Sequence, residues 1–215
     1  MKYVHGFVMV LIFSMTIGFA PSAGASLFIN EIHYDNDGSD VDEGVEIAGP
    51  AGTDLTDWSL ELYNGGNGLV YDTIDFLGTI PNQQNGFGTL FFGIAGIQNG
   101  APDGLALVDN TNNVVQFLSY EGTFTALGGS ATGLPSTDIG VSEASTTLSG
   151  FSLQLEGNGN QYDDFSWVTS PIAHTRGDIN AGQNFVPIPG AVWLLGSGLL
   201  GLGILRRKNT LRREA

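Results

Sequence analysis

The chain of 215 residues is 42% hydrophobic and is therefore long enough to bury one sizeable core. Because it contains no cysteine, disulfides, thiolate metal sites and a thiol nucleophile are excluded. Between residues 26 and 185, Arg176 is the only cation against 21 acidic residues, so this region has a net charge of −20. Such a surface repels phosphate backbones and attracts divalent cations, so we expect no direct binding to nucleic acid.

Residues 1–25 have the three-part layout of a secretory signal peptide. Lys2 is followed by an apolar stretch from Phe7 to Ala20 and by the small residues Ala23 and Ala25. This pattern predicts cleavage by signal peptidase after Ala25. The alternative is an uncleaved anchor helix, which Pro21 and the small residues after it disfavour.

From Leu27 onward, apolar and polar residues alternate with the period of two that is typical of half-buried strands. Trp58, Leu60 and Leu62 show it clearly, as do Phe151, Leu153 and Leu155. The 32 glycines and the low charged content of 13% also favour short strands with many turns. Strands are expected at 27–34, 45–48, 58–62, 69–76, 89–94, 105–109, 114–120, 151–155 and 165–168. Turns are expected at 110–113 and 157–160, and a long loop at 125–150, which together predict an all-β sandwich.

The densest acidic cluster of the chain lies between the first two expected strands. Its carboxylates are Asp35, Asp37, Asp40, Asp42 and Glu43. Oxygen ligands that alternate along a turn can face a hard cation, and Gly38 supplies backbone freedom, so these residues are a candidate Ca²⁺ site. The spacing is not that of an EF-hand. The alternative is a solvated acidic turn, and the sequence does not decide whether Asp163 and Asp164 join it.

Catalytic patterns are weak in this sequence. After signal cleavage only His33 and His174 remain, and no serine lies in a Gly-x-Ser-x-Gly elbow. His33 ends a strand, where a packed or hydrogen-bonded histidine is the ordinary outcome. Trp58 and Trp167 are expected in the core, whereas Tyr63 is expected to be more exposed and able to stack on a sugar. A metal-dependent hydrolase, nuclease-like or glycosidase-like, that uses the acidic cluster is the alternative to a non-enzymatic protein.

Several strings of the mature chain resemble the lamin-tail domain of secreted bacterial proteins. The strings are LFINEIHYDNDGSDVDEGVEIAGPAGTDLTDWSLELYN, NGAPDGLALVD, VVQFLSYEGTF, STDIGVSE, GFSLQLEG and DFSWV. The similarity spans roughly Leu27 to Phe185 and implies an immunoglobulin-like β-sandwich over residues 26–185. In the family this domain often precedes an extracellular nuclease domain; because the sorting signal follows directly here, we expect no nuclease domain, and the resemblance implies no catalytic residue.

The last part of the chain is an uncharged run from Val186 to Leu205 followed by three cations. Twenty residues in a helix span about 30 Å, the thickness of the bilayer hydrocarbon, and the cations are expected on the cytoplasmic side. This predicts a transmembrane helix in 186–208 and a cytoplasmic basic tail at 209–215. The run resembles the bacterial PEP-CTERM sorting signal through Pro187, Pro189, Trp193, Gly196, Ser197, Gly198, Arg206 and Arg207.

The resemblance to the sorting signal implies recognition by an exosortase, a membrane protease that removes the segment and passes the protein onward. Ile188 stands where the family has glutamate, and Gly190 where alanine is common. The alternative is a permanent anchor. Together the two resemblances predict a non-enzymatic binding or structural protein at the surface or in the extracellular matrix of a Gram-negative bacterium, transiently anchored in the inner membrane. Its expected ligands are an extracellular polysaccharide or a surface protein.

Overall fold

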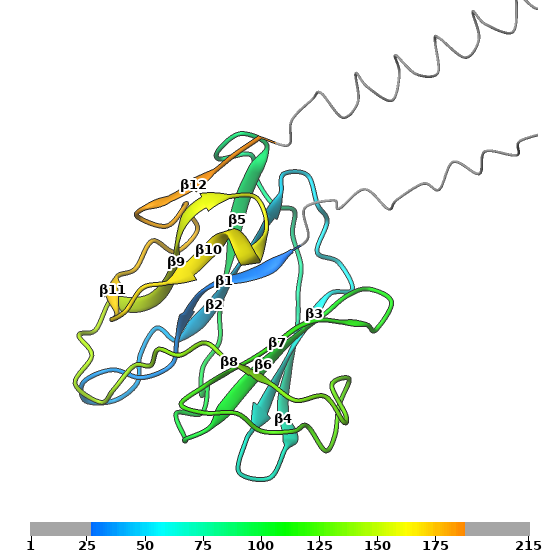
Figure 1. The fold of residues 1–215 in the computed structure, drawn as a ribbon, viewed down its shortest axis with the longest axis vertical. Helices are drawn as coiled ribbons and strands as arrows, with labels where there is room; N and C mark the ends of the chain where they lie inside the picture. The colour runs from blue at the N-terminus through cyan, green and yellow to red at the C-terminus, as the bar shows by residue number, and fades with distance from the viewer. Residues whose placement is uncertain (1–26, 188–215) are drawn as a thin grey trace, which may run out of the picture.

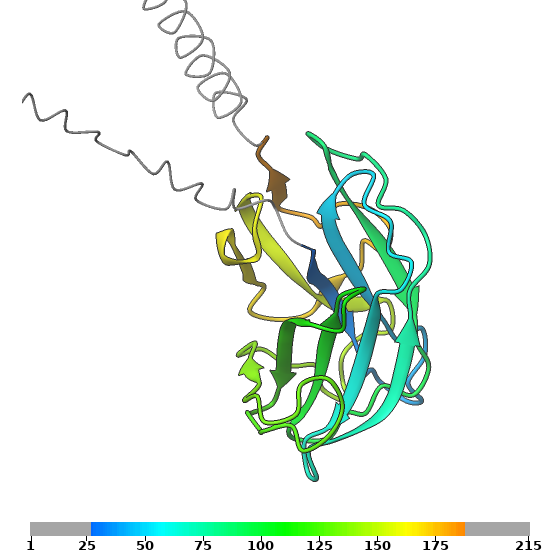
Figure 2. The same cartoon turned by 90° about the vertical axis from the view of Figure 1, so that its right-hand side faces the viewer.

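The computed structural model of the chain describes residues 27–187, which form two β-sheets packed against each other (Figure 1). Figure 2, turned by 90°, shows the two layers from the side. The all-β class and the two packed sheets agree with the sandwich expected from the alternating sequence.

The first sheet has the strand order β10-β9-β1-β2-β5. Its strands are β1 (Phe28–His33), β2 (Gly44–Pro50), β5 (Phe87–Gly93), β9 (Phe151–Gly159) and β10 (Phe165–Trp167). Two short strands, β11 (Ile172–Ala173) and β12 (Gln183–Phe185), also pair with β9. β12, the last described strand, pairs with β9 in parallel, and β9 also pairs with β1. β9 therefore connects the first and the last described strands of the chain.

The second sheet has the strand order β4-β3-β6-β7-β8. Its strands are β3 (Ser59–Asn64), β4 (Leu69–Asp75), β6 (Asp103–Val108), β7 (Val114–Tyr120) and β8 (Thr137–Asp138). A short 3₁₀ helix, η1 (Tyr162–Asp164), lies between β9 and β10.

The main core fills the space between the sheets. Each sheet contributes its inward residues, such as Ile32 and Ile47 from the first and Leu60 and Leu62 from the second, all of which are buried. Tyr34 and Tyr120 stack with ring centroids 3.9 Å apart and thereby link the end of β1 to the end of β7. A second cluster on the first sheet includes Phe28, Phe165 and Phe185.

All nine expected strands are confirmed, with ends displaced by a few residues. The turn expected at 157–160 is wrong, because β9 continues to Gly159 and the chain turns afterwards, through η1. The long β9 is stabilised by pairing with β1, β10, β11 and β12. The alternation of apolar and polar residues within β9 does not reveal these partners, so it could not predict the length of the strand. The turn at 110–113 is confirmed, where the Asn112 N–H donates to the Asp109 carbonyl.

Residues 125–150 form strand only at β8, as expected for a long loop, but the segment is packed against the sheets. Ala126 and Ala131 are buried with Tyr63, and Glu143 is buried near the end of β1.

The two ends of the described chain lie close together. Phe28 in β1 and Phe185 in β12 have ring centroids 6.4 Å apart. The segment 34–43 follows the other end of β1, and six strand residues at about 3.3 Å each separate the two ends by roughly 20 Å. The chain therefore enters and leaves at one end of the first sheet, and the acidic loop lies at the other (Figure 1).

Candidate functional site

The loop between β1 and β2, residues 35–43, is organised by Asn36. The Asn36 Nδ2 donates to the carbonyls of Asp37 and Ser39, and its Oδ1 accepts the Val41 N–H at 3.0 Å. The Asp37 N–H donates to the Thr147 carbonyl, so the loop is also tied to the 143–147 segment. These hydrogen bonds hold the acidic loop in place and tie it to the rest of the domain.

The five predicted metal ligands differ in burial and in their hydrogen-bond partners. Asp35 is buried against Glu143, and burial followed by the charge of Asp40 raises the pKa of Asp35. Asp37 is exposed. Glu43 turns inward, where its Oε2 accepts the Gly96 N–H at 2.7 Å and its Oε1 has no hydrogen-bond partner.

Only three of these carboxylates share one hollow. Asp40, Asp42 and Glu43 line it together with residues 93–95, and its volume is about 270 Å³. Within residues 27–187, no group of three or more His, Cys, Asp or Glu side chains is arranged to hold a metal ion. The Ca²⁺ site stays a prediction. Asp163 and Asp164 lie in η1, which packs near Phe28 at the opposite end of β1.

A second hollow, of about 370 Å³, adjoins the acidic loop. Amide and carboxyl side chains line it, namely those of Asn64, Gln98, Asn99 and Asp103. The Asn99 Nδ2 donates to Asp40 Oδ2 across a distance of 3.4 Å, which connects this hollow with the acidic loop. Asp103 accepts the N–H groups of Gly65 and Gly100 and fixes the loops on both sides. Polar groups of this kind can exchange hydrogen bonds with hydroxyl-rich ligands.

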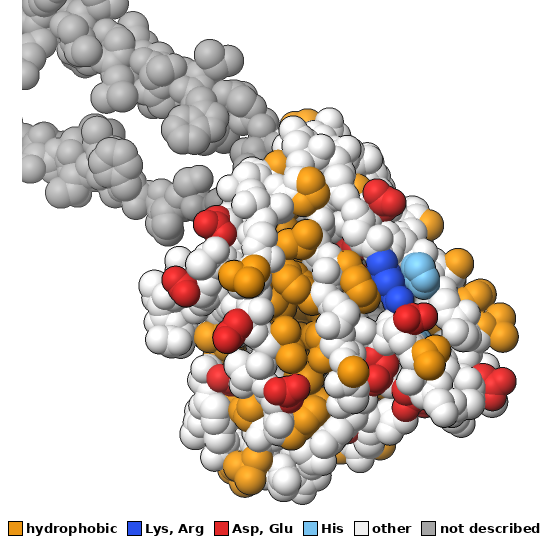
Figure 3. All heavy atoms as spheres, turned by 180° about the vertical axis from the view of Figure 1, so that it is seen from behind, with side chains coloured by type: hydrophobic (Ala, Val, Ile, Leu, Met, Phe, Trp, Pro, Cys, Tyr) orange, Lys and Arg blue, Asp and Glu red, His pale blue; other side chains and the backbone are white. Residues whose placement is uncertain are grey.

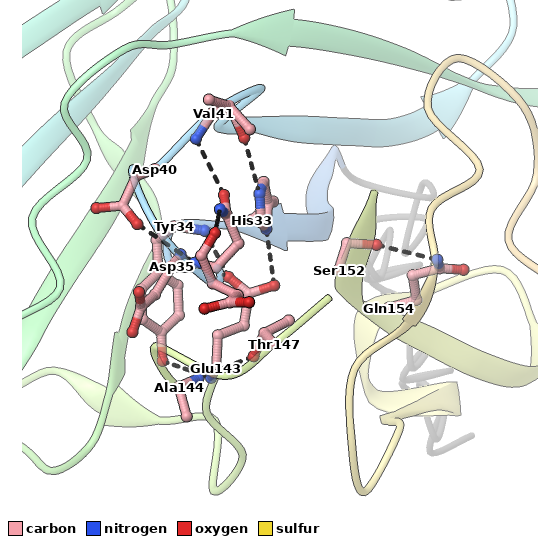
Figure 4. A network of polar contacts seen from close by, with 12 residues as sticks. His33, Tyr34, Asp35, Asp40, Val41, Glu143, Ala144, Thr147, Ser152 and Gln154 are labelled. Atoms are coloured by element: carbon pink, nitrogen blue, oxygen red, sulfur yellow. Dashed lines mark hydrogen bonds and ion pairs between the residues drawn. The ribbon is translucent and has the colours of Figure 1, made fainter. Parts of the chain in front are cut away.

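Beneath the acidic loop, Glu143 is the centre of a buried network (Figure 4). Its Oε1 lies 2.9 Å from His33 Nδ1, and its Oε2 accepts the N–H groups of Tyr34 and Asp35 at 2.6 and 3.0 Å. Burial lowers the pKa of His33, but the hydrogen bond and negative charge of Glu143 outweigh it and raise that pKa above its usual value. Since the His33 Nε2 contacts the Val41 carbonyl, both ring nitrogens are occupied and the hydrogen-bonded histidine expected here is confirmed.

The most deeply buried pair of carboxyl groups was missed by the sequence reasoning. Glu31 in β1 and Glu46 in β2 are directly opposite each other, flanked by Gln154 in β9 and Phe91 in β5. We call these four residues the carboxyl row. Glu31 and Glu46 are 1% and 0% exposed. A glutamate flanked by core residues within one expected strand could have revealed this pair, because Glu46 lies between Val45 and Ile47.

Residues 174–183 cover the carboxyl row. Thr175 donates to Glu31 Oε2 through its N–H and its hydroxyl, and the Gly177 N–H donates to Glu46 Oε2 at 2.6 Å. The Arg176 guanidinium lies over the Phe91 ring, 4.9 Å from the centroid. Arg176 is the only cation between residues 26 and 185, and Figure 3 shows a single blue spot among the described side chains of the rear face.

The prediction of an exposed Tyr63 is wrong, because Tyr63 is fully buried. Residues 124–131 cover its side of the second sheet: its hydroxyl donates to Glu61 and accepts the Ala131 N–H. Gly129, with φ at +68°, passes so close to the Tyr63 hydroxyl that a Cβ there would clash. Trp58 is half-buried against the main core and Trp167 against both clusters, so neither is a free platform.

The predicted targeting residues lie almost wholly outside the described part of the chain. The signal cleavage positions Ala23 and Ala25 precede it, and Pro189, Trp193, Gly196, Ser197, Gly198, Arg206 and Arg207 follow it. Pro187 is described and is exposed. Within residues 27–187, no helix has the length and apolar character needed to cross a membrane. Comparison of the chain with protein-family models, curated proteins and solved structures finds no match.

Proposed function

We propose that this chain is an exported, non-enzymatic binding or structural protein, of lamin-tail type, that an exosortase-type protease sorts to the cell surface or extracellular matrix. The observation that supports it best is the position of the chain ends. Leu27 and Pro187 border the two predicted membrane-directed segments, and both lie at the end of the first sheet that is far from the acidic loop. A sandwich anchored at its C-terminus would present the acidic loop away from the membrane.

The presented end has the features of a binding surface for polar ligands. Its loop is fixed by Asn36, its neighbour is the amide-lined hollow, and its charge disfavours nucleic acid. We therefore propose extracellular polysaccharide as the first ligand class, with another surface protein as the second. Signal peptidase and the exosortase act on the chain only during export.

The sorting proposal is tested by the C-terminal peptide of the protein isolated from its native host. We expect surface and matrix fractions to contain chains that end near Pro189, and the membrane fraction to contain a minor form that keeps Arg213. The variant Ile188→Glu restores the residue of the sorting-signal pattern and should shrink that minor form. Chains that retain Arg213 in every fraction would contradict processing and support a permanent anchor.

The binding proposal is tested by retention of the purified protein on polysaccharide from the same host. Asp40→Asn combined with Asn99→Ala should lower retention, because both side chains border the presented hollows. Asp163→Asn, at the opposite end of β1, is the control and should bind like the wild type. Hydrolysis of DNA or glycans by the wild type, lost in Asp37→Asn and Asp40→Asn, would instead establish the metal-dependent hydrolase.

A further inference from the structure

Three oxygen atoms surround the hydroxyl of Thr175. Its Oγ1 lies 3.0 Å from Glu31 Oε2, 3.2 Å from Gln154 Oε1 and 2.9 Å from Asn180 Oδ1. The hydroxyl has one proton and can satisfy one of these pairs, and a protonated Glu31 would satisfy one more. At least one close oxygen pair therefore lacks a hydrogen atom in either protonation state of Glu31.

The orientations of the two amides beside Thr175 are fixed by their other contacts. The Gln154 Nε2 donates to the Ala173 carbonyl at 2.8 Å and to Ser152 Oγ at 3.0 Å, the latter drawn in Figure 4. The Asn180 Nδ2 donates to two backbone carbonyls. Because a carbonyl only accepts, turning either amide around would bring its oxygen against a carbonyl oxygen. Both amide oxygens must therefore face Thr175.

Further buried oxygens beside this cluster also lack hydrogen-bond donors. Glu31 is 1% exposed, and its Oε1 has no partner within residues 27–187. Gln183 is 5% exposed, and its Oε1 has no partner in the same part of the chain, whereas its Nε2 donates to Asn30 Oδ1. Burying a polar atom without a partner is costly. The cluster thus lacks positive charge rather than acceptors.

Arg176, the residue after Thr175, does not supply that charge. Its guanidinium lies over Phe91 in β5, and β2 separates β5 from β1, so these two strands are roughly 10 Å apart. Its Nε and Nη2 are buried without an acceptor among the described residues, so they make no bond to Glu31. The oxygens around Thr175 are therefore left for another cation.

We propose that these oxygens form a Ca²⁺ site. Oxygens that coordinate one Ca²⁺ at about 2.3–2.6 Å lie about 3 Å from one another, which is the spacing found around Thr175 Oγ1. All three neighbours lie on the side of Oγ1 away from its own Cβ, as hydrogen-bond geometry requires, so they border a common space. The ligands are the carboxylate of Glu31, the hydroxyl of Thr175 and the amide oxygens of Gln154 and Asn180.

The chemistry of these ligands favours weak, selective binding of calcium. Only one ligand is a carboxylate, so the site differs from a cluster of acidic side chains, and its affinity falls in the range of extracellular modules, about 10⁻⁴–10⁻³ M. Mg²⁺ fits less well because it gives up its water shell reluctantly. The partial exposure of Thr175 leaves a path for the ion and room for a water ligand.

The bound ion connects three parts of the first sheet. Glu31 belongs to β1 and Gln154 to β9, whereas Thr175 and Asn180 belong to the segment 174–183 that covers the carboxyl row. This segment leads directly to β12. Calcium therefore holds the C-terminal end of the domain, in a chain that has no cysteine for a disulfide.

The first test compares the melting temperature of the full-length protein in calcium, in an equal concentration of magnesium, and with a chelator. Magnesium screens the same surface charge, so a rise beyond that in magnesium reports specific binding. Thr175→Val keeps the shape of the side chain and removes a ligand oxygen, so it should lose this extra rise. The control Asp40→Asn leaves these ligands intact and should keep an extra rise, whether or not the acidic loop also binds calcium.

Hydrogen exchange of the wild type locates the ion and decides if Thr175→Val fails to fold. Calcium at about ten times its dissociation constant should slow exchange of the Thr175 and Gly177 N–H groups about tenfold. Three results overturn the site, whatever the sorting and binding experiments show. They are protection by calcium of residues 37–42 alone, equal rises of the melting temperature in calcium and magnesium, and an undiminished calcium response in folded Thr175→Val.

Discussion

The acidic loop and the carboxyl row both concentrate carboxyl groups, but they place them in opposite environments. Residues 37–42 are exposed, so the carboxylates of this stretch face solvent. Glu31 and Glu46 are buried and depend on the 174–183 segment for most of their hydrogen bonds. Acidic residues of the first kind provide a surface, and those of the second kind determine how the end of the chain is held.

Between these two regions lies Glu143, whose removal should have the largest effect on stability. Glu143→Ala leaves the N–H groups of Tyr34 and Asp35 without their acceptor and removes the partner of buried His33. Losing one member of a buried pair costs about 3–5 kcal/mol. Denaturant unfolding should show a loss of this size.

The control for that change is Glu121→Ala, which removes one contact, to the Tyr34 hydroxyl, from an exposed side chain. Its effect should be much smaller. Equal unfolding free energies for Glu143→Ala and wild type would contradict the central role of Glu143.

Asn36→Ala should have an intermediate effect, because Asn36 holds the acidic loop from within. The change leaves the Val41 N–H without its acceptor and frees two carbonyls, and a lost hydrogen bond of this kind costs about 1–2 kcal/mol. Hydrogen exchange should accelerate at Val41, whereas Ser39→Ala should leave it unchanged. Unaltered exchange in Asn36→Ala would mean that the loop is held by other contacts.

Asp37→Asn should have the smallest effect on the free energy of unfolding, since surface substitutions away from special contacts usually change stability by less than about 0.5 kcal/mol.

The response of the melting temperature to calcium tests the acidic loop as a metal site. If the predicted Ca²⁺ site exists, calcium should raise the melting temperature of the wild type, a chelator should reverse the shift, and Asp40→Asn should reduce it. A flat response removes the metal site and leaves a solvated loop.

The alternation of apolar residues predicted the strands and the two-sheet class well, because the period of two depends on local sequence. It could not predict β8, β11 and β12, which are two or three residues long and form only through pairing with β7 or β9. Tyr63 was misjudged for the same reason, since the loop that buries it is distant in sequence. The acidic loop could be predicted because its carboxylates are neighbours in the sequence. Glu31, Gln154 and Thr175 are far apart in the sequence and meet only in the folded chain.

The central claim is that the buried carboxyl groups, those of Glu31 and Glu46 in the carboxyl row together with Glu143, carry the structural role of the acidic residues, and the acidic loop does not. The pKa of Glu46 rises from 4.5 to about 8 on burial, so the folded protein binds the proton more tightly than the unfolded chain. The resulting stability is fully present below about pH 4.5 and is lost as pH rises through about 8.

The most direct measurement is the unfolding free energy between pH 5 and pH 9, in about ten steps, for wild type, Glu46→Gln and Asp37→Asn. We predict that the wild type and Asp37→Asn lose stability together as pH rises, whereas Glu46→Gln, which cannot ionise, loses distinctly less. The contribution of His33 is common to all three proteins and cancels in the comparison. Parallel profiles for wild type and Glu46→Gln would contradict the claim.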